Sequence, residues 1–76
     1  MFAISDLWKN NFESVSCYQL DGTAYQNGSV LIGNKNNKTK VYVISDKTTD
    51  IDYACYVENI DTMDKLILLC ELINAT

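Results

Sequence analysis

Three aspartates near the middle of the chain, Asp46, Asp50 and Asp52, come closest to a metal-binding pattern. On a strand, Asp50 and Asp52 would share a face because Ile51 separates them, and with Asp46 they could hold a hard cation. The run lacks the glycine and the terminal glutamate that a calcium-binding loop requires. We therefore interpret it as an aspartate-rich turn, and we expect the protein to bind no metal and no other cofactor.

The side chains that could act as nucleophiles have no suitable partner in the sequence. Cys17, Cys55 and Cys70 would need a base, and the 76 residues include no histidine; arginine is also absent. The cysteines are odd in number and show no C-x-x-C spacing, so we expect reduced, buried thiols rather than a disulfide framework or a zinc site. The glycines fit turns and form no phosphate-binding loop. The sequence thus predicts that the protein is not an enzyme.

Charge is distributed unevenly along this acidic chain. Ten carboxylates against six lysines give a net charge of −4. The stretch from Asp46 to Asp64 holds six carboxylates and one lysine, whereas three lysines cluster at Lys35, Lys38 and Lys40. The acidic stretch is either a solvated edge or a patch that docks on a basic partner surface. Because an acidic protein repels nucleic acid and anionic membranes, we expect neither to be a direct partner.

Strand signals fill the middle of the sequence. From Ser14 onward the apolar period changes to two, which predicts strands at 15–20, 29–33 and 39–45. Residues 21–22 (Asp-Gly) and 27–28 (Asn-Gly) are both hairpin signals. The segment 21–29 is therefore either a tight meander with a very short strand or one long loop. Residues 35–38 are expected to form a polar turn.

The run 51–58 shows the cleanest alternation. Residues 51, 53, 55 and 57 are apolar or aromatic, whereas the intervening positions include Asp52, Tyr56 and Glu58. Such a strand belongs to a sheet that is packed on one face and exposed to water on the other. The exposed face predicts the partner-binding site, which we assign to Asp50, Asp52, Tyr56 and Glu58.

A short helix is expected at residues 4–12. Ile4, Trp8 and Phe12 recur every four residues and would lie on one face. A helix of this length is unstable alone, so we expect it to dock on the core through Trp8.

A longer helix is expected at residues 61–74, where Asp61 or Thr62 can act as the N-cap. One broad apolar face of this helix comprises Met63, Leu66, Ile67, Leu69, Cys70 and Ile73. Leu68 and Leu72 project from the opposite, polar face, one turn apart. Scattered exposed leucines are ordinary, but this pair favours contact with the amino-terminal helix or with another chain. We assign Leu68 and Leu72 as the oligomer interface.

These patterns predict a single α+β domain over residues 1–76. We expect an antiparallel sheet of three to five strands with a short N-terminal helix and a C-terminal helix packed on one face. The core should be shared by two sets of residues, one from the last strand and one from the last helix: Tyr53, Cys55, Val57, Leu66, Cys70 and Ile73. Neither a signal peptide nor an apolar run of transmembrane length is present, so we expect a cytoplasmic protein that spans no membrane.

Two functional hypotheses follow. The first is a non-enzymatic protein-binding module, a small acidic inhibitor or antagonist of a nucleic-acid-handling protein, of the kind that phages use against host defences. Its carboxylates would cover lysines and arginines that otherwise hold phosphate. The alternative is a structural or regulatory homo-oligomer, such as a homodimer, that assembles through Leu68 and Leu72 on the C-terminal helix.

Overall fold

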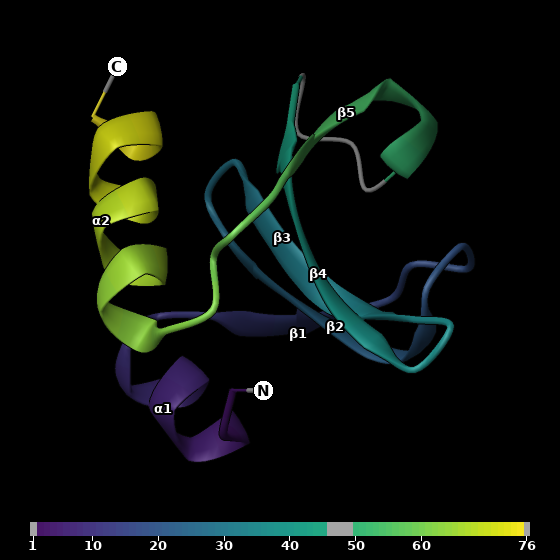
Figure 1. The fold of residues 1–76 in the computed structure, drawn as a ribbon, viewed down its shortest axis with the longest axis horizontal. Helices are drawn as coiled ribbons and strands as arrows, with labels where there is room; N and C mark the ends of the chain where they lie inside the picture. Colours follow the sequence, from purple (N-terminus) through teal and green to yellow (C-terminus); the bar gives the residue numbers. More distant parts are fainter. Residues whose placement is uncertain (1, 46–49, 76) are drawn as a thin grey trace.

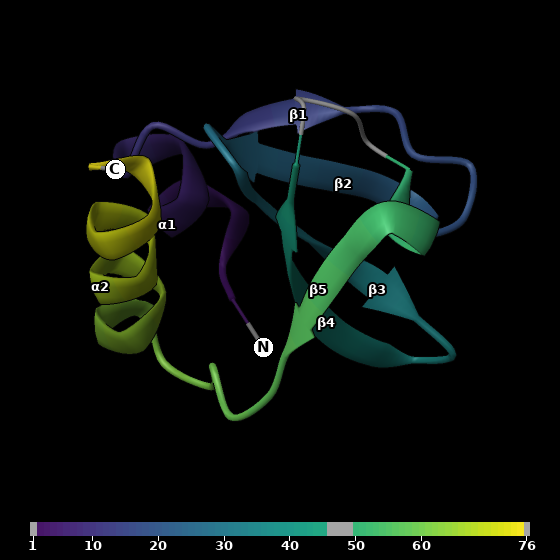
Figure 2. The ribbon, with the colours of Figure 1, turned by 90° about the horizontal axis from the view of Figure 1, so that it is seen from above.

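The computed structural model describes residues 2–45 and 50–75. Within these residues a five-stranded sheet is accompanied by a short helix near the N-terminus and a longer one near the C-terminus (Figure 1). Both helices lie at the same end of the sheet (Figure 2). The elements in chain order are α1 (Ile4–Lys9), β1 (Glu13–Val15), β2 (Asp21–Asn27), β3 (Val30–Lys35), β4 (Lys38–Ile44), the 3-10 helix η1 (Ile51–Tyr53), β5 (Ala54–Val57) and α2 (Met63–Asn74).

The sheet is an antiparallel meander in which the spatial order of the strands, β1-β2-β3-β4-β5, is their order in the chain. The turn between β3 and β4 consists of Asn36 and Asn37, whose φ angles are 54° and 65°. Positive φ at both central residues is the signature of a type I′ hairpin turn, and asparagine tolerates it. The expected α+β class and the polar turn at 35–38 are therefore confirmed.

The segment 21–29 resolves into a strand followed by a hairpin turn. Asn27 pairs with Val30, so the turn residues are Gly28 and Ser29, one position later than the Asn-Gly signal indicates. Gly28 has a φ of 59° and supplies the positive angle at the first turn position. The Asp-Gly pair at 21–22 is not a hairpin turn. It opens β2, where the register with β3 shifts between Asp21 and Tyr25.

Of the strand expected at 15–20, only Val15 lies in a strand, as the last residue of β1. β1 ends at Val15, and the chain then turns so that the amide of Leu20 donates a hydrogen bond to the carbonyl oxygen of Cys17 (3.1 Å). This turn buries Cys17 and Leu20 against the sheet. The alternating pattern at 15–20 therefore reflects a packed loop rather than a strand.

Both faces of the sheet carry buried side chains. The expectation of a sheet that is packed on one face and exposed to water on the other is therefore wrong. Residues of β3 and β4 alternate between the two faces. One cluster lies on the side of the helices and contains Leu7, Phe12, Val30, Ile32, Val41, Leu66 and Cys70. The second lies under the 16–20 loop and contains Cys17, Leu20, Ala24, Leu31, Tyr42 and Ile44. The small domain thus gains a second core from a loop and one turn of 3-10 helix.

The expected strand at 51–58 begins three residues late. The carboxylate of Asp50 caps η1 by accepting a hydrogen bond from the amide of Asp52 (3.0 Å), which draws residues 51–53 out of the sheet. Tyr53 is consequently 74% exposed, and its assignment to the core is wrong. Cys55 is also exposed, because it lies on an edge strand and has a strand neighbour, Val43, on one side only.

The remaining core assignments fare better. Leu66 and Cys70 are buried, as expected, whereas Val57 and Ile73 are half-buried. The N-cap of α2 is Thr62, whose hydroxyl accepts a hydrogen bond from the amide of Lys65 (3.3 Å).

The N-terminal helix docks through Leu7 and Phe12 instead of Trp8. α1 ends at Lys9, and Asn11 then adopts a positive φ of 66° so that the amide of Phe12 donates to the carbonyl oxygen of Leu7 (3.0 Å). This left-handed helix end reverses the chain and turns Phe12 into the core. Trp8 is left 52% exposed, with its ring edge-on to Tyr25 at a centroid distance of 6.0 Å.

Candidate functional site

The predicted partner-binding residues gather around an edge of the sheet. β5 is the last strand in the sheet order, and its outer side has no strand partner among the described residues. Asp50 and Asp52 precede it, and Glu58 follows it directly. We refer to β5 together with these three carboxylates as the β5 edge. The other edge strand, β1, is only three residues long.

Asp50 caps η1 and also binds the side chain of Gln19. Its carboxylate accepts hydrogen bonds from the amide of Asp52 and from Nε2 of Gln19 (2.8 Å). Oε1 of the same Gln19 accepts from the amide of Ile51 (2.8 Å). Gln19 therefore ties the 16–20 loop to η1 with both ends of its amide. Asp50 is half-buried by this arrangement and positions the more exposed Asp52 beside it.

Tyr56 lies on β5 directly opposite Tyr42 on β4. The two rings are tilted by 51° with centroids 5.6 Å apart. Burial, followed by the neighbouring Tyr56 and Cys17, raises the pKa of Tyr42, which stays protonated at neutral pH. Tyr56 is 48% exposed, so one part of its ring packs on Tyr42 and the other faces solvent.

The sequence predicts that the Tyr56 ring is surrounded by carboxylates, but the structure also places a lysine, Lys40, over this ring. Its Nζ lies 4.7 Å from the centroid of the Tyr56 ring, within the range of a cation–π interaction. The predicted face is also divided, because Asp52 belongs to η1 rather than to the strand. The structure therefore places Tyr56 on β5, Glu58 directly after the strand and Asp52 before it.

The charge along this part of the chain is nonetheless one-sided. Five carboxylates and no lysine occur between residues 50 and 64. Asp61 forms an ion pair with Lys65 (2.9 Å), which lowers the pKa of its carboxyl through that hydrogen bond and charge. Asp46, also part of the acidic stretch and of the cation pattern in the sequence, lies outside the described residues. Across 2–45 and 50–75, no three acidic or cysteine side chains converge as metal ligands.

The predicted oligomer residues lie where the helical pattern places them. Leu68 and Leu72 are 55% and 61% exposed on α2, while Leu66 and Cys70 of the same helix are buried. α1 leaves this pair in solvent. The two functional hypotheses thus rest on different elements, the unpaired edge strand β5 and the apolar pair on α2.

Sequence reasoning missed two exposed tyrosines close to the β5 edge. Tyr18 is 86% exposed in the loop that Gln19 ties to η1, and Tyr53 is 74% exposed at the end of η1. Tyrosine is enriched in interfaces because it combines a large apolar ring with a hydrogen-bonding hydroxyl. The aspartate-rich composition before Tyr53 was the available signal, because aspartates cap short helical turns and interrupt strands.

No protein-family model, curated protein or solved structure matches the chain. Neither helix of the described chain has the length and apolar character needed to cross a membrane.

Proposed function

We propose that the protein is a non-catalytic protein-binding module that takes up a basic, extended segment of a partner protein along the β5 edge. The observation that carries the proposal is an unpaired edge strand bounded at both ends by carboxylates. An edge strand offers a row of backbone donors and acceptors to which an extended peptide can add as a further strand.

The composition of β5 favours strand addition. Proteins commonly guard an edge strand with lysine or proline, or with a bulge. β5, with the sequence Ala-Cys-Tyr-Val, contains neither lysine nor proline, and its register with β4 is regular from Val41–Val57 to Ile44–Ala54. Tyr56 is 48% exposed, and the part of its ring that neither Tyr42 nor Lys40 contacts supplies an aromatic surface for a side chain of the incoming strand.

The charges select the partner. Asp52 and Glu58 are exposed at opposite ends of the strand, so a segment with lysine or arginine near both ends would be complementary. Complementary charge mainly raises the association rate and the selectivity. Proteins that handle nucleic acid expose such cations, and covering them would block phosphate binding. An inhibitor of this class of protein, as in the anti-defence proteins of phages, is the biological role that fits the chemistry.

The test uses a synthetic peptide of alternating lysine and valine, with the amide signals of the ¹⁵N-labelled protein as the readout. A second peptide of the same sequence carries N-methyl groups on alternate amides, which keeps the charge but removes the donors for strand pairing. We expect the first peptide to shift the amides of residues 54–57 and the second to bind at least about tenfold more weakly.

Charge reversal at two positions tests the role of the carboxylates. Asp52→Lys with Glu58→Lys should abolish binding of the unmodified peptide. The matched control, Glu13→Lys with Glu71→Lys, changes the net charge equally at two exposed sites away from β5 and should retain it. Equal binding of the two peptides, equal loss in both double variants, or no binding at all would contradict the proposal.

A second candidate function is self-association through α2. It is favoured by the exposure of Leu68 and Leu72 on adjacent turns, on a helix whose other face is buried. Two copies related by a two-fold axis would pair these leucines. Sedimentation at micromolar concentration should show a dimer that Leu68→Lys with Leu72→Lys converts to a monomer. A monomeric unmodified protein would rule this candidate out.

A further inference from the structure

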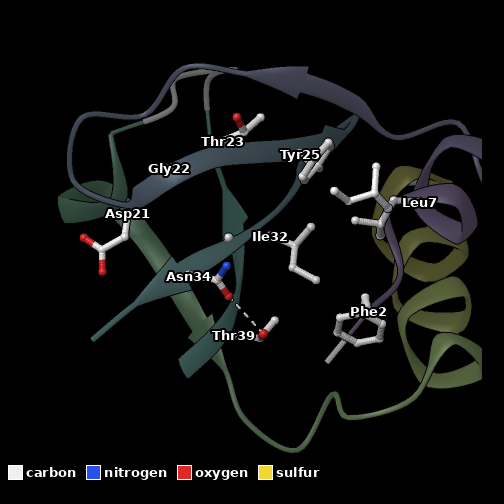
Figure 3. Close-up of a pocket in the computed structure, with 11 residues that line it drawn as sticks. Phe2, Leu7, Asp21, Gly22, Thr23, Tyr25, Ile32, Asn34 and Thr39 are labelled. Carbon is white, nitrogen blue, oxygen red and sulfur yellow. Dashed lines mark hydrogen bonds between the residues drawn. The ribbon is translucent and has the colours of Figure 1, made fainter. Parts of the chain in front are cut away.

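A cavity of about 390 Å³ lies between the N-terminal segment and the helix-side face of the sheet (Figure 3). This size falls within the range of small-molecule binding sites. β2 and β3 supply most of the sheet wall of the cavity, and Thr39 adds a residue of β4, the strand next to β5. Nothing in the proposed partner binding makes use of it.

The cavity has two chemically different sides. Its apolar side is formed by Phe2, Ile4, Leu7, Tyr25 and Ile32. Its polar side is formed by Asp21, Thr23, Asn34 and Thr39. The boundary follows the sheet register, because Tyr25 pairs with Ile32 in one row whereas Asn34 pairs with both Asp21 and Thr39 in another. The helix layer covers the apolar row and leaves the polar row open.

A local irregularity of β2 opens this space. Between Asp21 and Tyr25 the strand advances four residues while β3 advances two, from Asn34 to Ile32. The additional residues include Gly22, which has a φ of 71° and no atom within 4 Å of the place where a side chain would begin. Bulges of this kind redirect side chains and are frequent beside binding sites.

The polar groups of the cavity are held in place and retain capacity for a ligand. Thr39 Oγ1 donates a hydrogen bond to Oδ1 of Asn34 (3.1 Å), which directs the amide nitrogen of Asn34 away from Thr39 (Figure 3). Oδ2 of Asp21 accepts from the amide of Asn36 (3.0 Å). An amide donor, a hydroxyl and a carboxylate oxygen therefore line one wall, a set that suits groups able both to donate and to accept.

The charge of the lining disfavours anions. Among residues 2–45 and 50–75, Asp21 is the one charged residue that lines the cavity. Lys35 and Lys38 follow Asn34 and precede Thr39 in the chain, and strand alternation directs their side chains to the opposite face. Among these described residues, a phosphate or carboxylate ligand would meet a carboxylate and no cationic side chain. On the apolar side, Trp8 stabilises the Tyr25 ring edge-on, which provides a fixed aromatic surface.

From these features we propose that the cavity binds a pyranose sugar unit. A pyranose is neutral, has a C–H face that packs on aromatic and aliphatic side chains, and carries hydroxyls that donate and accept at its rim. Its apolar face would lie against Tyr25 and Ile32, and its hydroxyls would reach Asn34, Thr39 and Asp21. The assignment rests on the cavity and is independent of the β5 edge.

The experiment is a titration of the ¹⁵N-labelled full chain with the methyl glycosides of glucose, galactose, mannose and N-acetylglucosamine. Cyclohexanol, arginine methyl ester and inorganic phosphate serve as apolar, cationic and anionic comparisons. At least one glycoside should shift the amides of Tyr25, Ile32 and Asn34 more strongly than any comparison compound does. The amides of residues 54–57 should not move, which separates this result from peptide binding.

Two variants test the polar wall. Asn34→Leu and Thr39→Val remove hydrogen-bonding groups while nearly keeping side-chain volume, and each should weaken glycoside binding by about tenfold. The control, Gln26→Leu, lies on the other face of the sheet and should leave it unchanged. The proposal is wrong if no glycoside shifts these amides, if a comparison compound binds more tightly, or if both wall variants bind as well as the control.

Discussion

The side chain of Asn74, in the last turn of α2, forms hydrogen bonds on both sides of Gly28 in the β2–β3 hairpin, although Asn74 and Gly28 are 46 positions apart in the chain. Oδ1 of Asn74 accepts a hydrogen bond from the amide of Ser29 (2.9 Å). Its Nδ2 donates to the carbonyl oxygen of Asn27 (3.1 Å) and to the side-chain oxygen of the same residue (3.3 Å). One side chain thus attaches the C-terminal helix to the turn between two central strands.

Gly28→Ala should destabilise the protein more than Gly22→Ala. Both glycines have a positive φ, so each substitution introduces backbone strain of about 1–2 kcal/mol. A methyl group at Gly28 would also collide with the side-chain amide of Asn74, whereas one at Gly22 would meet open space. Displacing Asn74 loses its hydrogen bonds, at about 0.5–1.5 kcal/mol each. Urea denaturation measures the difference in the free energy of unfolding.

A double-mutant cycle isolates the contact between Gly28 and Asn74. In an Asn74→Ala background the collision is absent, so Gly28→Ala should lower the free energy of unfolding by about as much as Gly22→Ala does. If Gly28→Ala has the same effect with and without Asn74, the hairpin and the helix are not coupled through this side chain.

The sequence predicts the parts of the fold that local chemistry determines. The polar turn at 35–38 is expected from its composition, and it forms because Asn36 and Asn37 tolerate positive φ. The buried side of α2 depends on a helical period that places Leu66 and Cys70 together. In both cases the residues that set the structure are neighbours in the chain, and the pattern is sufficient.

Prediction from the sequence is wrong where a residue distant in the chain determines the local backbone structure. The alternation at 51–58 is genuine, yet Gln19 binds Asp50 and the Ile51 amide across more than thirty positions and stabilises a 3-10 turn there. The same contact exposes Tyr53 and divides the predicted face. No local period reports whether a glutamine elsewhere in the chain will compete for a strand's hydrogen bonds.

Leu66→Ala should lower the free energy of unfolding by about 2–5 kcal/mol, because Leu66 is fully buried in the cluster that joins α2 to the sheet. Leu68→Ala is the matched control on the same helix. At 55% exposure its effect should be within about 0.5 kcal/mol. Chemical denaturation at low protein concentration tests the pair, and comparable losses would mean that the two faces of α2 have been assigned wrongly.

Gln19→Glu should destabilise the loop that covers the second core. The substitution replaces the Nε2 donor with an oxygen that faces the carboxylate of Asp50, while the acceptor for the Ile51 amide remains. The loss of a hydrogen bond to a charged group predicts about 1.5–3 kcal/mol. Hydrogen exchange at the Ile51 amide should accelerate. The control is Gln26→Glu, because the Gln26 side-chain amide donates to the carbonyl oxygen of Gly28 at an exposed site; exchange at the Ile51 amide should stay unchanged in this variant.

The Cys70 thiol should make the protein less stable in alkaline solution. Burial, followed by the charge of Glu71, raises the pKa of this thiol from 9.0 to about 11. Below pH 9 both the folded and the unfolded chain keep the proton, so the contribution to stability is complete. Between about pH 9 and 11 the unfolded chain loses its proton first, and the free energy of unfolding falls as the pH rises.

Cys70→Ala should flatten this slope in urea denaturation, whereas Cys55→Ala, which removes an exposed thiol, should leave it as it is. The raised pKa of Tyr42 acts in the same direction and is present in both variants, so it does not affect the comparison. Identical slopes for the two variants would show that Cys70 ionises in the folded protein as readily as it does in the unfolded chain.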